Sequence, residues 1–298
     1  MDLVDGMRVF VAAVETGSFA GAAGRVGISA KLASKYMAQL EARMGTPLFY
    51  RTTRRLGLTA AGRRLMAQAP DWLDQLDEMA SGLRDEQRGL SGTIRVSAAV
   101  THGEMVIAPL LRRFRAAHPD LVIDLRLSDR FVDLVAEGID IAIRIGTLED
   151  SALMARRLGG MSLVLVASPA YLRSRGHPAA PDDLTGHACI RDTNMRGDGS
   201  WPLTDAGRER RIRVTGHFLV NSARAARDLA LADQGIAFCP DHVVQEYLDR
   251  NRLVRVLPDV RGPRLDIHAV YLRQRRMTRR SRDLLAFLVE GLGGPGAA

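Results

Sequence analysis

Residues 29–36, SAKLASKY, form the stretch that decides the fold of the first part of this chain, and they hold both of its lysines. Ser29 is a good N-cap, so a helix is predicted to begin at Ala30. One face of this helix is apolar: Leu32, Ala33, Tyr36, Met37, Leu40 and Met44. The opposite face carries small, hydroxyl and cationic residues: Ala30, Lys31, Ser34, Lys35 and Ala38. This pattern is typical of a helix that reads base edges in the major groove of DNA.

The sequence around this helix predicts a winged helix-turn-helix. The spacing of Met7, Phe10, Val11 and Val14 predicts a first helix, which Gly17 can end. A second helix, 19–26, follows the cap Ser18, and Gly27 supplies the turn before Ser29. Beyond it, 47–51 and 56–58 read as two short strands, and Thr59 as the cap of a long helix. The tip between the strands is a basic wing that would lie along phosphates or a minor groove: Arg51, Thr52, Thr53, Arg54 and Arg55.

The bland alternative is that the basic face is only the solvated side of an ordinary helix. Overall charge does not decide between the two, because a net charge of +8 in an arginine-rich chain can reflect genome composition. The distribution of charge is more informative. Residues 1–64 hold 10 Lys/Arg and 4 Asp/Glu, whereas residues 65–92 hold 2 and 6. Positive charge is therefore densest where the pattern predicts DNA binding.

Several other classes of protein are disfavoured. No apolar run reaches the ~20 residues of a membrane helix, and the N-terminus lacks a signal peptide, so we expect a cytoplasmic protein. Two cysteines, Cys189 and Cys239, are too few for a disulfide framework or a zinc site. The glycine motif at 291–296 has no strand-to-helix unit around it. No catalytic motif is present, so we expect no enzyme, no metal and no cofactor.

The N-terminal sequence closely resembles a LysR-type transcriptional regulator. The resemblance rests on MRVFVAAVETGSF at 7–19, QLE at 39–41, PLF at 47–49, RTTR at 51–54 and LTAAG at 58–62. It continues in DLVAEGIDIAIRIG at 133–146 and SPAYL at 168–172. The chain departs from the family at Ala30 and Lys31, where many members carry an amide followed by Pro or Ser. An amide can read adenine and a lysine cannot, so the operator sequence does not carry over.

The predicted domain order is a winged helix-turn-helix at 1–58, a linker at 59–90 and an effector-binding domain at 91–298. The linker carries a helical apolar stripe with acids beside it, which needs a partner surface. The resemblance implies that it is the dimerisation helix, giving a homodimer or homotetramer; the alternative is that it packs on its own domain. Pro70 is unfavourable inside a helix and either kinks it or starts a second helical half.

From Thr93 onward, strands alternate with helices, which predicts an α/β fold with a parallel sheet. The expected helices include 104–117, 131–137, 223–233, 241–249 and 281–291. The resemblance implies a two-lobed, periplasmic-binding-protein-like domain with an effector between the lobes. Lobe one would comprise 93–166 and 268–291, and lobe two 167–267.

Ligands of open α/β sheets lie beyond the carboxyl ends of strands. This rule selects as effector-binding candidates Val100, Thr101, His102, Ser128, Gly146, Thr147, Ser168, Asn221 and Ser222. Helix N-termini bind anions, so a carboxylate effector is reasonable. Thr101 either contacts the ligand or caps its own helix, because Thr101 and Glu104 form a T-x-x-E capping box. His102 is either a ligand contact or structural, Trp201 either lines the cleft or the core, and Cys239 is either an inert buried thiol or a redox sensor.

The leading hypothesis is a sequence-specific regulator that binds double-stranded promoter DNA and is gated by a small-molecule effector, with RNA polymerase as a candidate partner. The runner-up is a sequence-tolerant architectural DNA-binding protein without an effector. A solute-binding or enzymatic module with an accessory head is the third alternative. Its function would survive deletion of residues 1–58.

Overall fold

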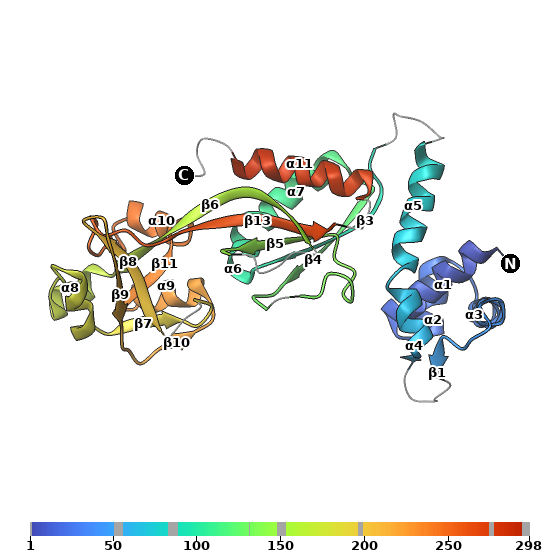
Figure 1. Cartoon of the computed structure of the whole chain (residues 1–298), viewed down its shortest axis with the longest axis horizontal. Coiled ribbons are helices and arrows are strands. Elements are labelled where there is room, and N and C mark those ends of the chain that lie inside the picture. The colour runs from blue at the N-terminus through green and yellow to red at the C-terminus, as the bar shows by residue number, and fades with distance from the viewer. Residues whose placement is uncertain are drawn as a thin grey trace. The chain divides into compact units, whose positions relative to one another are not determined.

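A computed structural model describes residues 2–50, 56–82, 89–130, 132–147, 153–195, 199–273 and 277–293. The chain divides into two compact units (Figure 1). The first comprises residues 1–92 with the short segments 133–138 and 277–280, and the second comprises the rest of 93–298.

The first unit begins with the three predicted helices, α1 (Leu3–Thr16), α2 (Phe19–Val26) and α3 (Ala30–Met44). The predicted caps are confirmed: the hydroxyl of Ser18 accepts the N–H of Gly21, and that of Ser29 accepts the N–H of Leu32. Gly17 and Gly27 have left-handed backbone angles (φ +68° and +75°), which a residue with a side chain rarely adopts. Each therefore ends a helix and turns the chain into the next one.

The wing strands are shorter than predicted. β1 (Phe49–Tyr50) pairs antiparallel with β2 (Gly57–Leu58), and residues 51–55 between them lie outside the described residues. After them, Thr59 caps α4 (Ala60–Met66), accepting the N–H of Gly62 as predicted. The linker is two helices rather than one, because a turn at residues 67–68 separates α4 from α5 (Ala69–Gly82). Pro70 is the second residue of α5, which confirms the alternative that it starts a second helical half.

The second unit is built on one nine-stranded sheet in the order β10-β7-β11-β6-β13-β5-β3-β4, with β12 also paired to β6. Two long strands, β6 (Leu153–Ala167) and β13 (Arg264–Leu272), pair antiparallel and join the two halves of this sheet (Figure 1). β6 pairs with β13 through Ser162 and with β11 from Leu163 onward. The change between lobes therefore falls about four residues before the predicted boundary at 166/167.

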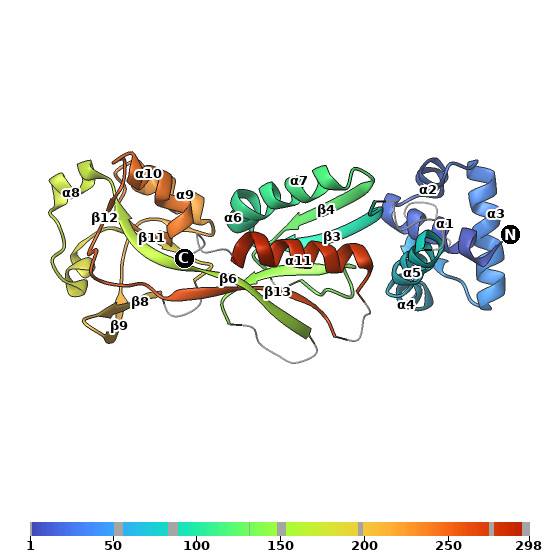
Figure 2. The same cartoon turned by 90° about the horizontal axis from the view of Figure 1, so that it is seen from above.

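Lobe one holds β3 (Gly92–Ala98), β4 (Leu121–Leu127) and β5 (Ile141–Ile145). The helices α7 (Ala108–Ala117) and α11 (Arg279–Gly293) lie side by side over one face of its sheet (Figures 1 and 2). The rings of Phe114 and Phe287 join these helices, with centroids 5.3 Å apart. The helix predicted near 131–137 is wrong for the described residues, because 132–133 have no regular structure and 134–138 form a turn. The Asp133 carboxylate accepts the N–H groups of Val135 and Ala136, a local bonding pattern that competes with a helix.

The helix predicted at 104–117 begins earlier than expected and is not uniform. It consists of α6 (Val100–His102), a π-helical turn (Gly103–Ile107) and α7. A Cβ on Gly103 would lie 2.3 Å from a terminal methyl group of Leu127, so a side chain here would require Leu127, at the end of β4, to move. π-helical turns inside longer helices are frequent at functional sites.

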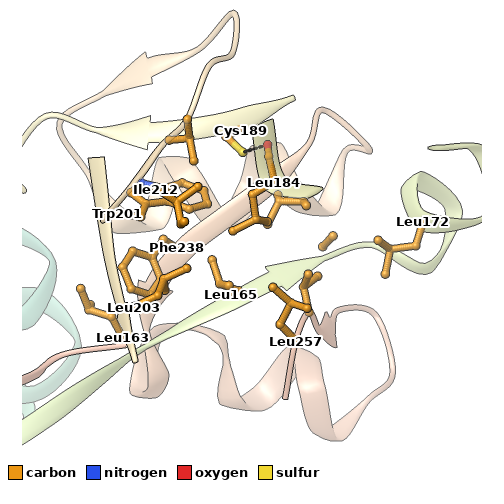
Figure 3. Close-up of a cluster of buried hydrophobic side chains, with 14 of the residues drawn as sticks. Leu163, Leu165, Leu172, Leu184, Cys189, Trp201, Leu203, Ile212, Phe238 and Leu257 are labelled. Carbon is orange, nitrogen blue, oxygen red and sulfur yellow. Dashed lines mark hydrogen bonds between the residues drawn. The ribbon is translucent and has the colours of Figure 1, made fainter. Parts of the chain in front are cut away.

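Both faces of the sheet are buried in lobe two. Alternate residues of each strand point to opposite faces, so each strand contributes to a core on each side. On one face Leu165 of β6 and Phe238 of β11 (Ile236–Pro240) pack with Trp201 of the hairpin β8 (Ser200–Asp205) and β9 (Arg208–Arg213) (Figure 3). On the other face Val166 and Cys239 pack against the helices α9 (Ala223–Leu231) and α10 (Asp241–Asp249). Trp201 is therefore a core residue, 3 % exposed, and does not line a cleft.

Lobe two has further elements among its described residues. They are α8 (Pro169–Arg175), a 3-10 helix (Pro181–Gly186), β7 (Cys189–Asp192), β10 (Leu219–Val220) and β12 (Val254–Arg255). β7 runs parallel to both β10 and β11, so the carboxyl ends of these strands meet at the same edge.

Candidate DNA-binding surface and effector site

The face of α3 that the sequence assigns to DNA is exposed along its length. Ser29, Ala30, Lys31, Ser34, Lys35 and Ala38 are all exposed, whereas Ala33, Met37 and Leu40 are buried in the core of the three helices. The ammonium groups of Lys31 and Lys35 make no hydrogen bond or ion pair with the described residues, so both are available to a phosphate or a base. The two lysines lie one helical turn apart on this face.

Glu41 is a residue whose role the sequence analysis missed. One carboxylate oxygen, Oε1, accepts the N–H of Leu48 at 2.7 Å and that of Phe49 at 3.2 Å. This contact ties the first wing strand to α3, so the two elements predicted to bind DNA are fixed to each other. The wing candidates Arg51, Thr52, Thr53, Arg54 and Arg55 lie outside the described residues.

In the second unit, most effector candidates lie at one edge of the sheet, where the two lobes meet. Val100 begins the helix after β3, and the N–H of Ser128 donates to the carbonyl of Ala98 at the end of β3. Gly146 (φ +89°) and Thr147 follow β5, which is parallel to β3. From lobe two, Asn221 and Ser222 follow β10, and Ser222 caps α9 by accepting the N–H of Ala225.

Two residues outside the predicted set connect these candidates. Asp129 accepts the N–H of Val100 through Oδ1 at 2.9 Å, and the amide Nδ2 of Asn194 through Oδ2 at 3.2 Å. The same Nδ2 donates to the carbonyl of Asn221 at 2.7 Å. Asp129 and Asn194 therefore join lobe one to lobe two in the middle of the predicted site. Both directly follow strands or their turns, which is the signal that could have found them.

The capping interpretation of Thr101 is wrong. The N-cap of α6 is Ala99, which makes no side-chain cap, and Thr101 lies inside the helix. The carboxylate of Asp129 takes the capping role through Val100. An anion at this helix N-terminus is thus already supplied by the protein, and a ligand carboxylate has to displace Asp129 to reach the same donors.

His102 is buried, 4 % exposed, and its ring packs edge-on against His242 of lobe two at a centroid distance of 5.4 Å. Neither ring nitrogen of His102 has a hydrogen-bond partner among the residues that the structure describes. Burial, and then the nearby His242, lower the pKa of His102 to about 4. The side chain is therefore neutral near pH 7 and packs at the junction of the lobes.

A third contact between the lobes is an ion pair. Nη1 of Arg224 on α9 lies 2.6 Å from Oε2 of Glu104 in the π-helical turn, with both side chains roughly half-exposed. Burial raises the pKa of Asp192 at the end of β7, and the nearby Asp129 carboxylate adds to this rise. The lobes in this structure are thus held together by Asn194, His242 and Arg224.

Ser168 does not belong to this group. The strand β6 continues to Ala167, so Ser168 lies at the end of lobe two where α8 begins. It is 4 % exposed, and its hydroxyl caps α8 at the N–H of Tyr171 and donates to Oδ1 of Asp233 at 2.5 Å. The prediction placed Ser168 near the point where the chain passes between lobes. In the structure β6 makes that passage at 162/163 and continues into lobe two.

Both cysteines are buried and unpaired. Burial raises the pKa of Cys189 to about 12 and also raises the pKa of Cys239 well above its ordinary value. Such thiols are poor nucleophiles, which favours the inert interpretation. Within the described ranges, no three His, Cys, Asp or Glu side chains could hold a metal ion, and no helix is long and apolar enough to cross a membrane.

Comparison with known families gives a match over nearly the whole chain. Residues 4–63 match the family of bacterial regulatory helix-turn-helix proteins of the LysR type, and residues 87–293 match the LysR substrate-binding domain. The chain therefore belongs to the LysR family of DNA-binding transcriptional regulators.

Individual relatives agree with this. An uncharacterised HTH-type transcriptional regulator of Haemophilus influenzae is 34 % identical over 93 % of this chain and 96 % of its own. The regulator PtxR of Pseudomonas aeruginosa is 34 % identical over 96 % of this chain and 92 % of its own. Among solved structures, CrgA of Neisseria meningitidis covers 97 % of this chain and 98 % of its own, with a TM-score of 0.64 and 30 % identity. Full-length AphB, a virulence activator of Vibrio cholerae, covers 97 % and 99 %, with a TM-score of 0.62 and 29 % identity.

Proposed function

We propose that this regulator binds specific double-stranded promoter DNA through α3 and the wing, and that a small molecule bound between the lobes of the second unit changes that binding. The observation that carries the proposal is the pairing of two features in one chain. A fully exposed basic helix face lies in the first unit, and a group of polar residues drawn from both lobes lies in the second.

For DNA, the proposal assigns base and phosphate contacts to Ser29, Ala30, Lys31, Ser34 and Lys35. Small residues at Ala30 and Ser34 let the helix enter the major groove, and the lysines supply point charges for phosphates or guanine. The wing, 51–55, supplies further cations along the backbone. A dimer formed through α4 and α5 would place two such helices on two half-sites about one DNA turn apart.

For the effector, the proposal assigns the site to Val100, Thr101, His102, Ser128, Gly146, Thr147, Asn221 and Ser222, with Asp129 and Asn194 added. The contacts between Asp129 and Asn194 are made in the arrangement described here, and a ligand that takes the same donors and acceptors replaces them. A bound molecule therefore shifts the balance between arrangements of the two lobes by its difference in affinity for them. A carboxylate effector must displace Asp129, whereas an effector with hydroxyl or amine donors can bind to it.

The test is a nuclease footprint of the full-length protein on the DNA upstream of its own gene and its neighbours, with excess competitor DNA. A discrete protected region supports the regulator, whereas diffuse protection lost to competitor supports the architectural alternative. The matched variant carries Thr101→Val and Ser128→Ala together. We expect it to keep the footprint, and we expect an active metabolite no longer to change that footprint. An unchanged response would discard the site assignment.

A further inference from the structure

We propose that lobe two carries a second small-molecule site, a pocket for a ligand with a carboxylate or phosphate group, formed by Arg175, His187 and His217. The pocket has a volume of about 680 Å³ and is lined by α8, the segment 185–188, the segment 215–217 and the pair Asp233 and Gln234. This site is independent of the proposed effector site and does not rest on the DNA-binding proposal.

The pocket lies at the opposite edge of the sheet from the effector candidates. Three of its lining residues precede strands: Ala188 before β7, His217 before β10 and Gln234 before β11. The effector candidates Asn194 and Asn221 instead follow β7 and β10. β7 is 4 residues long, so roughly 13 Å of strand separates the two edges. The same strands therefore carry one site at each end.

The cationic side of the pocket is unpaired. Arg175, the last residue of α8, is exposed, and its guanidinium makes no hydrogen bond or ion pair with the described residues. Burial lowers the pKa of His187, and the Arg175 charge adds to this effect, although Asp183 opposes it. Burial raises the pKa of Tyr171, an effect that the Arg175 charge partly offsets. A guanidinium without a carboxylate partner beside two imidazoles is suited to a planar or tetrahedral oxyanion.

His187 presents a donor to this pocket. The Tyr171 hydroxyl accepts the N–H of Ala188 at 3.0 Å and lies 3.2 Å from Nδ1 of His187, against 3.5 Å from the Ala188 carbonyl. We therefore assign the hydroxyl proton to His187 Nδ1, which leaves the imidazole proton on Nε2. None of the described residues accepts a hydrogen bond from Nε2–H of His187. His217, which is exposed, adds a second imidazole from the segment before β10.

The acidic residues nearby are already engaged. Oδ1 of Asp233 accepts the hydroxyl of Ser168, and the Asp183 carboxylate accepts the N–H groups of Ala179 and Ala180. Asp233 still lines the pocket, so a ligand with one anionic group and a hydroxyl or amine fits better than a polyanion.

The test is calorimetric titration of the full-length protein with inorganic phosphate and, separately, with acetate, in buffer free of other oxyanions. The pocket variant is Arg175→Gln with His217→Gln, whose side chains are exposed and whose loss leaves the core intact. The matched control is Arg173→Gln, an exposed arginine of the same helix that does not line the pocket. A second control, Lys31→Ala with Lys35→Ala, removes phosphate binding by the recognition helix.

We expect the protein to bind at least one probe saturably. The affinity for that probe should fall about tenfold or more in the pocket variant and stay unchanged in both controls. Hydrogen exchange should slow in peptides covering 169–190 and 212–236. The relative strength of phosphate and acetate identifies which anionic group the pocket prefers. Binding that the pocket variant leaves unchanged, binding lost equally in Arg173→Gln, or no saturation by tens of millimolar of either probe would overturn the proposal.

Discussion

Oδ2 of Asp129 in lobe one lies 3.2 Å from Nδ2 of Asn194 in lobe two, and this hydrogen bond is the centre of the proposed effector site. The same carboxylate caps α6 through Val100, so Asp129 links the start of the irregular helix to the opposite lobe. In the proposed site, a ligand would therefore act on both the helix N-terminus and the contact between lobes.

Asn194→Ala removes the hydrogen bond to the charged Asp129. A well-formed hydrogen bond to a charged group contributes about 1.5–3 kcal/mol, and an exposed one such as this contributes less. We expect the arrangement held by Asp129 to become less populated and the effector concentration for half-response to change several-fold, while DNA affinity without effector changes less. Footprint titrations measure both. Gln245→Ala, which removes an exposed hydrogen bond on α10, is the control, and equal behaviour of the two variants would count against the proposed link.

The two recognition lysines should differ from other cations of the same helix. If Lys35 contacts phosphate, Lys35→Ala weakens binding to all sequences and reduces the slope of log affinity against log salt by about one. If it contacts a base, preference at one operator position is lost instead. Arg43→Ala, at the other end of α3, should change neither quantity by a comparable amount. Identical effects of Lys35→Ala and Arg43→Ala would show that only net charge matters.

Glu41→Gln makes a prediction with an unusual sign. Removing an acid near a DNA-binding surface ordinarily strengthens binding to a polyanion. Here the carboxylate accepts the N–H groups of Leu48 and Phe49, and an amide oxygen accepts them less strongly, so we expect stability lower by about 1 kcal/mol and weaker, not stronger, DNA binding. Denaturant unfolding and band-shift assays measure the two effects. Glu15→Gln, which breaks an ion pair with Arg25, is the control, and tighter binding by Glu41→Gln would refute the assigned role.

Burial of His102 should make stability fall in mild acid. Its pKa is about 4 in the folded protein and 6.5 when unfolded, so the unfolded chain binds a proton first. Stability is fully present above about pH 6.5 and declines as pH falls toward 4, by up to about 3 kcal/mol. The nearest titratable groups are His242 and, beside it, Asp241. His102→Leu should flatten this decline, whereas His177→Leu, an exposed position, should not. An unchanged acid profile in His102→Leu would contradict the assignment.

Neither cysteine should react with thiol reagents in the folded protein. Both thiols are buried with raised pKa values, so the thiolate is scarce at pH 8. We expect both to react quickly only after unfolding in denaturant, and peroxide to leave DNA binding unchanged. Rapid modification of one cysteine in the native protein would restore the redox-sensor interpretation.

The sequence predicted local structure best where one residue determines it. Ser18, Ser29 and Thr59 cap helices and Gly17 and Gly27 turn the chain as their residue types require. It predicted least where contacts are long-range. The partners of β6 change in the middle of one continuous strand, so no local signal marks the crossing and Ser168 was misplaced. Asp129 and Asn194 lie 65 residues apart, and only the folded sheet brings them together.

The most direct test of the central claim is the footprint of the full-length protein on its own upstream DNA, with competitor and a panel of small metabolites that includes carboxylates. Effector-gated, sequence-specific regulation predicts a discrete protected region that changes with one class of compound. In the double variant Thr101→Val with Ser128→Ala, the protected region should remain and that compound should no longer change it. Diffuse protection that competitor removes, and that every compound leaves unaltered, would contradict it.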